Sequence, residues 1–90
     1  MRTLRYSAKF KKDYKRCLKR GLSIGALTAV LELLAKGDTL PSRYRDHELV
    51  GGYFGHRECH ITPDWLLIYR IDNEEAILTA VRTGSHSDLF

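Results

Sequence analysis

The apolar residues between positions 8 and 36 recur with the period of an α-helix, in two separate runs. The first run holds Phe10, Tyr14, Cys17 and Leu18, and the second holds Ile24, Leu27, Leu31 and Leu34. Ser7 and Ser23 precede the runs and can cap the helices, because a serine hydroxyl accepts a hydrogen bond from a free backbone N–H. Gly21 and Gly37 follow the runs and end them. Two helices joined by so few residues should form an antiparallel hairpin.

After position 54 the apolar and polar residues alternate with the period of a β-strand. The strand predicted for residues 55–62 has Arg57, Cys59 and Ile61 on one face and His56, Glu58 and His60 on the other. Residues 65–71 are almost continuously apolar, as expected of a central strand that helices cover on one side. Residues 76–83 are predicted to form the last strand, and residues 2–6 a short first strand.

These elements predict an α+β fold in a single domain that spans residues 1–90. The predicted order is β-α-α-β-β-β, an antiparallel sheet with the helix hairpin packed on one face. Residues 40–53 contain a proline and a Gly-Gly pair, so they are expected to be irregular, and residues 85–90 form a short tail. No repeat and no linker rich in Pro, Gly or Ser marks a domain boundary.

The composition supports a globular domain, since 43% of the 90 residues are hydrophobic and 29% are charged. No stretch approaches the roughly 20 apolar residues of a membrane span, and the first residues lack an apolar signal region. Cys17 and Cys59 lie 42 positions apart without a CxxC motif, so neither a disulfide framework nor a zinc ribbon is indicated. We therefore expect a cytoplasmic protein without a membrane partner.

Positive charge is concentrated at the start of the chain. Residues 1–20 hold nine of the fifteen Lys and Arg residues and one acid, Asp13, so this segment carries +8 and the remainder −4 of the total of +4. Such an asymmetry predicts a polyanionic partner, either a nucleic acid or an acidic protein, although a solvated helix face would also account for it. The predicted RNA-docking residues are Lys9, Lys11, Lys12, Lys15, Arg16, Lys19 and Arg20.

The predicted meander brings the end of the strand 55–62, the start of 65–71 and the end of 76–83 to one edge of the sheet. That edge collects His60, Asp64, Trp65, Arg82 and His86. His56 shares a face with His60 but lies about 13 Å away along the strand, so it is left out of the site. His47 reaches the edge only if residues 46–53 fold back onto it.

Such an edge suits the cleavage of RNA by transesterification. A general base removes the 2′-OH proton, the oxygen attacks the adjacent phosphorus, and a general acid protonates the departing 5′-oxygen. Histidine serves either role because its ordinary pKa, about 6.5, lies close to neutral pH. Arg82 would stabilise the charge that develops on the phosphate, and Trp65 or Phe90 would stack a base. The chemistry requires no metal and no other cofactor.

Structural interpretations stay open for several of these residues. Trp65 is equally consistent with a core residue, Asp64 with turn chemistry, and Asp46 with a turn or surface residue. A metal site is conceivable, but no ligand spacing such as HxxxH supports it. Its members would be His47, His60 and His86.

Three motifs of the chain resemble those of a known family. Residues 46–51 fit D-H-x-L-x-G, residues 60–69 fit H-x-x-P-D-W-x-L-I-Y, and residues 82–86 fit R-T-G-[ST]-H. In this order, over essentially the whole chain, they are similar to the YafQ-type toxins. These toxins belong to the RelE/ParE superfamily of bacterial type II toxin–antitoxin systems. The combination is far more specific than any one motif.

The resemblance implies a ribosome-dependent endoribonuclease that cuts messenger RNA in the decoding site and is held inactive by a cognate antitoxin. The functional positions of the family fall on His47, His60, Asp64, Trp65, His86 and Phe90. The resemblance therefore adds His47 to the edge. We take His86 as the general acid and His47 or Asp64 as the base, and His60 as a residue that orients either or contacts phosphate. The basic helix would bind ribosomal RNA.

The same superfamily supplies a second hypothesis, a ParE-like toxin that inhibits DNA gyrase without cutting RNA, because the fold alone does not decide the function. The three histidines favour the nuclease, since a pure protein inhibitor has no need of them. A third hypothesis is a module whose basic helix only docks an acidic protein. In each case an antitoxin that is acidic in its toxin-binding segment would cover the same surface.

Overall fold

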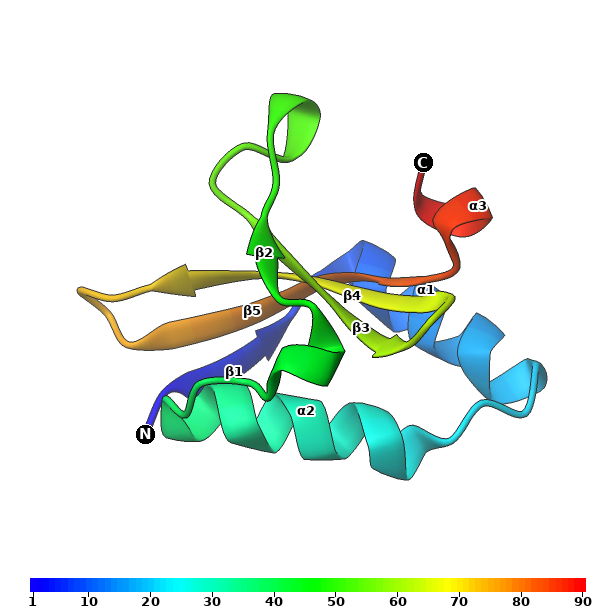
Figure 1. Ribbon diagram of the computed structural model, residues 1–90, viewed down its shortest axis with the longest axis horizontal. Helices are drawn as coiled ribbons and strands as arrows, with labels where there is room; N and C mark the ends of the chain where they lie inside the picture. Colours follow the sequence, from blue (N-terminus) through cyan, green and yellow to red (C-terminus); the bar gives the residue numbers. More distant parts are fainter.

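In the computed structural model, which describes residues 1–90, one five-stranded sheet carries helices on both faces (Figure 1). The strands are β1 (Thr3–Tyr6), β2 (His47–Glu48), β3 (Arg57–Thr62), β4 (Trp65–Asp72) and β5 (Ile77–Gly84). The helices are α1 (Ala8–Lys19), α2 (Ile24–Lys36) and the short α3 (His86–Leu89), and 3₁₀ turns occupy Ser42–Tyr44 and Gly51–Tyr53. The predicted α+β class is confirmed, and β2 and α3 are additional elements.

The strand order across the sheet is β1-β5-β4-β3-β2, with β4 in the centre. The antiparallel meander of β3, β4 and β5 is confirmed, and β2 also pairs antiparallel with β3. The expectation of a wholly antiparallel sheet is wrong at one strand, because β1 pairs parallel with β5. Two helices separate β1 from the rest of the sheet, so no hairpin fixes its direction.

The main core lies between the sheet and the pair α1 and α2. Phe10 and Cys17 of α1 and Leu27 and Leu34 of α2 pack there against Leu67 and other side chains of the central strands. The Ser7 and Ser23 side chains cap the two helices as predicted, by accepting hydrogen bonds from backbone N–H groups of the first turn. None of the helices is both long and apolar enough to cross a membrane.

A smaller apolar cluster covers the opposite face of the sheet. Leu66 and Ile68 of β4 pack there with Leu89 of α3, and Tyr53 lies against them. Figure 1 shows α3 and the segment between β2 and β3 on this face, away from α2. Residues 40–53 and 85–90, which were predicted as loop and tail, therefore contain β2 and α3 and contribute side chains to this cluster.

Candidate active site at the sheet edge

Three histidines from three different elements converge on the open face of the sheet. His47 lies on β2, His60 on β3 and His86 at the start of α3. The ring centroids of His47 and His60 are 6.3 Å apart, and those of His60 and His86 are 5.7 Å apart. The segment 46–53 thus folds back onto the edge, the condition that the sequence set for including His47. His56, which the prediction left out, packs against Tyr53 instead.

Glu58 lies between two of these histidines, and the sequence prediction did not include it. Its Oε1 is 3.5 Å from His47 Nε2 and 3.7 Å from His60 Nε2, and the residue is only 4% exposed. Its register position accounts for this placement, because Glu58 is opposite His47 across the strand pair and two residues before His60. The alternation along residues 55–62 was the signal that could have identified it.

Backbone carbonyls determine which ring nitrogen of two histidines carries a proton. His47 Nδ1 lies 2.7 Å from the Arg45 carbonyl oxygen, and His60 Nδ1 lies 3.2 Å from that of Pro63. Since a carbonyl oxygen only accepts, each Nδ1 is a donor. The Nε2 atoms of both rings therefore face Glu58 and are the positions at which these histidines exchange protons.

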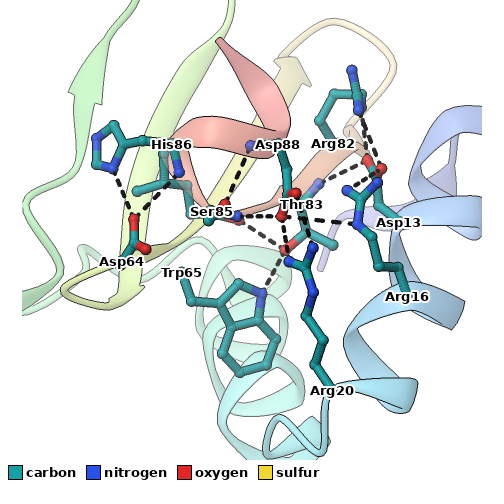
Figure 2. A network of polar contacts seen from close by, with 11 residues as sticks. Asp13, Arg16, Arg20, Asp64, Trp65, Arg82, Thr83, Ser85, His86 and Asp88 are labelled. Carbon is teal, nitrogen blue, oxygen red and sulfur yellow. Dashed lines mark hydrogen bonds and ion pairs between the residues drawn. The ribbon is translucent and has the colours of Figure 1, made fainter.

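His86 is paired with Asp64. The Asp64 carboxylate accepts hydrogen bonds from His86 Nδ1 at 3.2 Å and from the His86 backbone N–H at 3.3 Å (Figure 2). These bonds lower the pKa of the Asp64 carboxyl, the side-chain bond more than the backbone bond. Asp64 thus stays ionised and leaves Nε2 as the nitrogen of His86 that can give or take a proton.

The strand that carries His47 is anchored by Asp46, which is therefore more than a turn or surface residue. The Asp46 carboxylate accepts a hydrogen bond from the Tyr69 hydroxyl and bonds of 3.2 and 3.3 Å from the Arg57 guanidinium. Burial, and then the hydrogen bond to Asp46, raise the pKa of Tyr69, so its hydroxyl remains a donor. These bonds hold the start of β2 against β3 and β4.

Helix α3 has only one turn, and α1 holds it in place. Asp88 and Ser85 form a capping box at its start. The guanidinium of Arg20, the C-cap residue of α1, donates two hydrogen bonds to the Asp88 carboxylate, and Arg16 of α1 lies 3.8 Å from it. The bond from Arg20, followed by that from the Ser85 backbone, holds the pKa of Asp88 well below its usual range.

Two members of the predicted site lie away from the histidines. Arg82 donates two hydrogen bonds, of 2.6 and 3.2 Å, to the buried carboxylate of Asp13 on α1. Trp65 is only 2% exposed, and its indole N–H donates to the Thr83 hydroxyl at 2.9 Å. Figure 2 shows Arg82 and His86 at opposite ends of this polar network. Trp65 is therefore a core residue, and Arg82 is engaged with α1.

The predicted RNA-docking residues divide into two groups. The lysines Lys9, Lys11, Lys12, Lys15 and Lys19 are exposed on α1 and make no ion pair. Arg16 and Arg20 instead pair with Asp13 and Asp88, so their charges are partly neutralised within the protein. Phe90, predicted to stack a base, is 65% exposed and meets only the edge of Tyr53 at 5.9 Å between ring centroids.

The site also contains groups that could bind a metal ion. One ligand atom each of Glu58, His60 and His86 lie within 4.8 Å of one another. This set differs from the three histidines considered in the sequence, because the carboxylate takes the place of His47. Imidazole and carboxylate ligands of this kind suit a zinc or other transition-metal ion.

The family model for "Bacterial toxin of type II toxin-antitoxin system, YafQ" matches residues 2–90. The mRNA interferase toxin YafQ of Escherichia coli K12 is 38% identical over 90 residues, which cover 99% of this chain and 96% of that protein.

Two solved structures have the same fold. The crystal structure of a metal-bound toxin from Helicobacter pylori superposes with a TM-score of 0.94 and 46% identity, covering 100% of both chains. YafQ in the Escherichia coli DinJ–YafQ complex gives a TM-score of 0.91 and 37% identity, covering 100% of this chain and 99% of that one.

With these matches, the fold and the histidine site define a bacterial toxin of a type II toxin–antitoxin system. The chain belongs to the YafQ family of these toxins, the family that its sequence motifs resemble.

Proposed function

We propose that this YafQ-family toxin is an mRNA interferase, an endoribonuclease that cuts messenger RNA by 2′-OH transesterification and so arrests translation. One observation carries the proposal: the His86–Asp64 pair lies beside the group formed by His47, Glu58 and His60, with 5.7 Å between the His60 and His86 rings. Two acid–base groups on either side of a reacting phosphate are what this reaction needs.

His86 is the general acid of the proposed reaction. Asp64 holds the proton of Nδ1, so protonated Nε2 gives its proton to the 5′-oxygen as the P–O5′ bond breaks. The products are a 2′,3′-cyclic phosphate and a 5′-hydroxyl. Asp64 accepts bonds from His86 and therefore acts through it, as a positioning residue.

His47 is the general base. Of the two bases that the sequence left open, Asp64 is engaged with His86, which favours His47. Its Nε2 takes the 2′-OH proton, and the buried Glu58 carboxylate stabilises the imidazolium that results. His60 lies between the other two rings and contacts the phosphate.

The proposed reaction uses no metal ion and takes place on the ribosome, in the cytoplasm. A metal-dependent reaction is the alternative to test, because a metal ion could bind between Glu58, His60 and His86. The related Helicobacter pylori toxin has been crystallised with metal bound. Cleavage that persists after the toxin alone is treated with EDTA, freed of the chelator and added to ribosomes supports the metal-free reaction. Cleavage that this treatment removes and zinc restores contradicts it.

The protein partner is a cognate antitoxin, as DinJ is for the Escherichia coli YafQ. The exposed lysines of α1 suit an acidic segment of the antitoxin, and in its absence they suit ribosomal RNA. A groove of about 530 Å³ beside two of these lysines has an apolar lining, which suits a protein more than an RNA. Its apolar residues are Tyr6, Phe10, Tyr14, Leu18, Leu27 and Leu31.

The histidine site is tested by the variant His86→Ala, with His56→Ala as a matched control because His56 lies outside the site. Loss of a general acid lowers the rate by about 10²–10⁴-fold, so His86→Ala should abolish growth arrest while folding and antitoxin binding persist. The His56→Ala variant should remain toxic. Full toxicity of a folded His86→Ala variant would overturn the catalytic role.

Mapping the 5′ ends of cellular mRNA after induction tests the substrate. If the 5′ ends fall at the same position within codons throughout the reading frame, they support cleavage on the ribosome. Stalled DNA replication with intact transcripts would instead favour the ParE-like inhibition of gyrase.

A further inference from the structure

A hollow of about 390 Å³ opens directly beside the histidine site. His60 forms part of its wall, so the hollow and the site are continuous. The other lining residues come from the 3₁₀ turn before β2 and from the end of β3: Arg43, Tyr44, Arg45, Ile61, Thr62 and Pro63. Neither the sequence motifs nor the proposed mechanism uses the two arginines.

These two arginines are free of acidic partners. Arg16, Arg20, Arg57 and Arg82 each pair with an aspartate, whereas no carboxylate lies within 4.0 Å of Arg43 or Arg45. Two positive charges beside a reaction site, without a counter-charge from the protein, suit an anionic ligand.

Local contacts hold the Arg43 side chain and the Arg45 backbone in place before any ligand binds. The guanidinium of Arg43 lies over the Tyr44 ring at 4.8 Å and donates to the Tyr44 hydroxyl at 3.0 Å. Arg45 has a φ of 49°, in the left-handed region that residues other than glycine rarely adopt. Its carbonyl accepts the Nδ1 proton of His47, so its backbone is tied to the catalytic base.

We propose that Arg43 and Arg45 form a subsite for a phosphodiester of the RNA substrate, one that flanks the phosphate being cleaved. The subsite rests on the proposed function, because His60 contacts the reacting phosphate on one side and lines the hollow on the other. Arginine matches phosphate geometry with paired N–H donors. Phosphate contacts set the register of a nucleic acid without reading its sequence. The subsite therefore positions the message whichever bases it carries.

The test compares Arg43→Gln/Arg45→Gln with Arg5→Gln/Arg70→Gln. The control removes two exposed, unpaired arginines next to Thr79, on the part of the sheet far from the histidines. On programmed ribosomes the subsite variant should raise KM at least about tenfold, as expected for lost charge-assisted hydrogen bonds, with kcat and its pH profile unchanged. The control should match wild type. Arg43→Gln alone, which leaves Arg45 untouched, should give part of the effect.

Messages with a single neutral methylphosphonate at each flanking phosphate identify the contact. Wild type should lose affinity at one position, and the subsite variant should be insensitive there. A subsite variant that keeps the wild-type KM overturns the subsite. A variant with a raised KM that still loses affinity with a methylphosphonate at every position where wild type does also overturns it, because the two arginines would then contact ribosomal RNA. Failure of wild type to cleave any message would instead overturn the proposed function.

Discussion

At the residue scale, Glu58 sets the charge balance of the site. Its buried carboxylate lies closest to the Nε2 atoms of His47 and His60, at 3.5 and 3.7 Å, and no hydrogen-bond donor of the backbone reaches it. A buried carboxylate is unfavourable unless positive charge accompanies it. The carboxylate can therefore stabilise the positive charge that His47 takes on when it accepts the 2′-OH proton in the proposed reaction.

Glu58→Gln keeps the shape of the side chain and removes its charge. We expect kcat to fall by about 10²–10⁴-fold, the range for an acid–base group, while the thermal midpoint does not fall, because removing a buried charge also removes the cost of its desolvation. Ribosome-based cleavage assays and thermal unfolding measure the two quantities. Glu48→Gln, at an exposed carboxylate on the same strand pair, is the control. A destabilised but active Glu58→Gln variant would show that Glu58 is purely structural.

At the element scale, the single turn of α3 depends on its bonds to other elements. The capping box closes its first turn, Leu89 buries its apolar side, and Arg20 binds Asp88. At Gly84 the φ is 156°, and an added Cβ would lie 2.9 Å from the Asp88 side chain. The glycine of the R-T-G-[ST]-H motif therefore permits α3 to pack closely against the end of β5.

Asp88→Asn tests how this helix is held. Because the folded-state pKa of Asp88 lies below its ordinary value of 3.8, the carboxylate stabilises the fold above about that pH and loses its effect as the pH falls further. We expect the variant to melt several degrees lower at pH 7, with a smaller difference at pH 3. Thermal unfolding at both values measures this, with Asp38→Asn at an exposed, unbonded aspartate as the control. An equal difference at both pH values would contradict the argument.

Periodicity predicted the long elements and their order, but shorter ones gave no periodic signal. β2 has two residues and α3 has four, too few for a pattern to repeat. The parallel direction of β1 was not predictable either, because β1 pairs with β5, which lies at the other end of the sequence. The convergence of His60, Asp64 and His86 followed from the meander, whereas His47 needed the family motif.

The misplaced site residues have a common physical origin. Arg82 meets Asp13 across 69 positions of sequence, and Trp65 meets Thr83 across 18. No local pattern shows that an arginine suited to phosphate already has a buried carboxylate as its partner. The same holds for Arg16 and Arg20, whose charges count toward the basic segment but are directed toward aspartates.

At the scale of the whole molecule, the basic surface and the histidines lie on different faces of the sheet. The lysines belong to α1, which packs on the face of the main core, while Glu58 and His60 point to the opposite face. An antitoxin that binds α1 therefore does not need to fill the histidine site. The proposed RNA substrate, in contrast, must reach the open face.

The antitoxin should therefore associate by electrostatic attraction to α1. We expect its association rate to fall about tenfold or more as salt screens the lysines, the range seen for steered association. Stopped-flow mixing at increasing ionic strength measures the rate. Lys11→Glu/Lys15→Glu should slow association more than Lys36→Glu, which lies at the end of α2. An association rate that changes neither with salt nor with the substitutions of the α1 lysines would rule out this interface.

The bonds from α1 to the second half of the chain have a consequence for genetics. Asp13 holds Arg82 and the Thr83 backbone, and Arg20 holds the helix that begins with His86. In a saturation screen for alleles that permit growth, inactivating substitutions would accumulate at Asp13 and Arg20 as well as at the histidines. A map of such alleles would outline the junction between α1 and α3. Without the structure, this group of positions would be mistaken for a surface that contacts the ribosome.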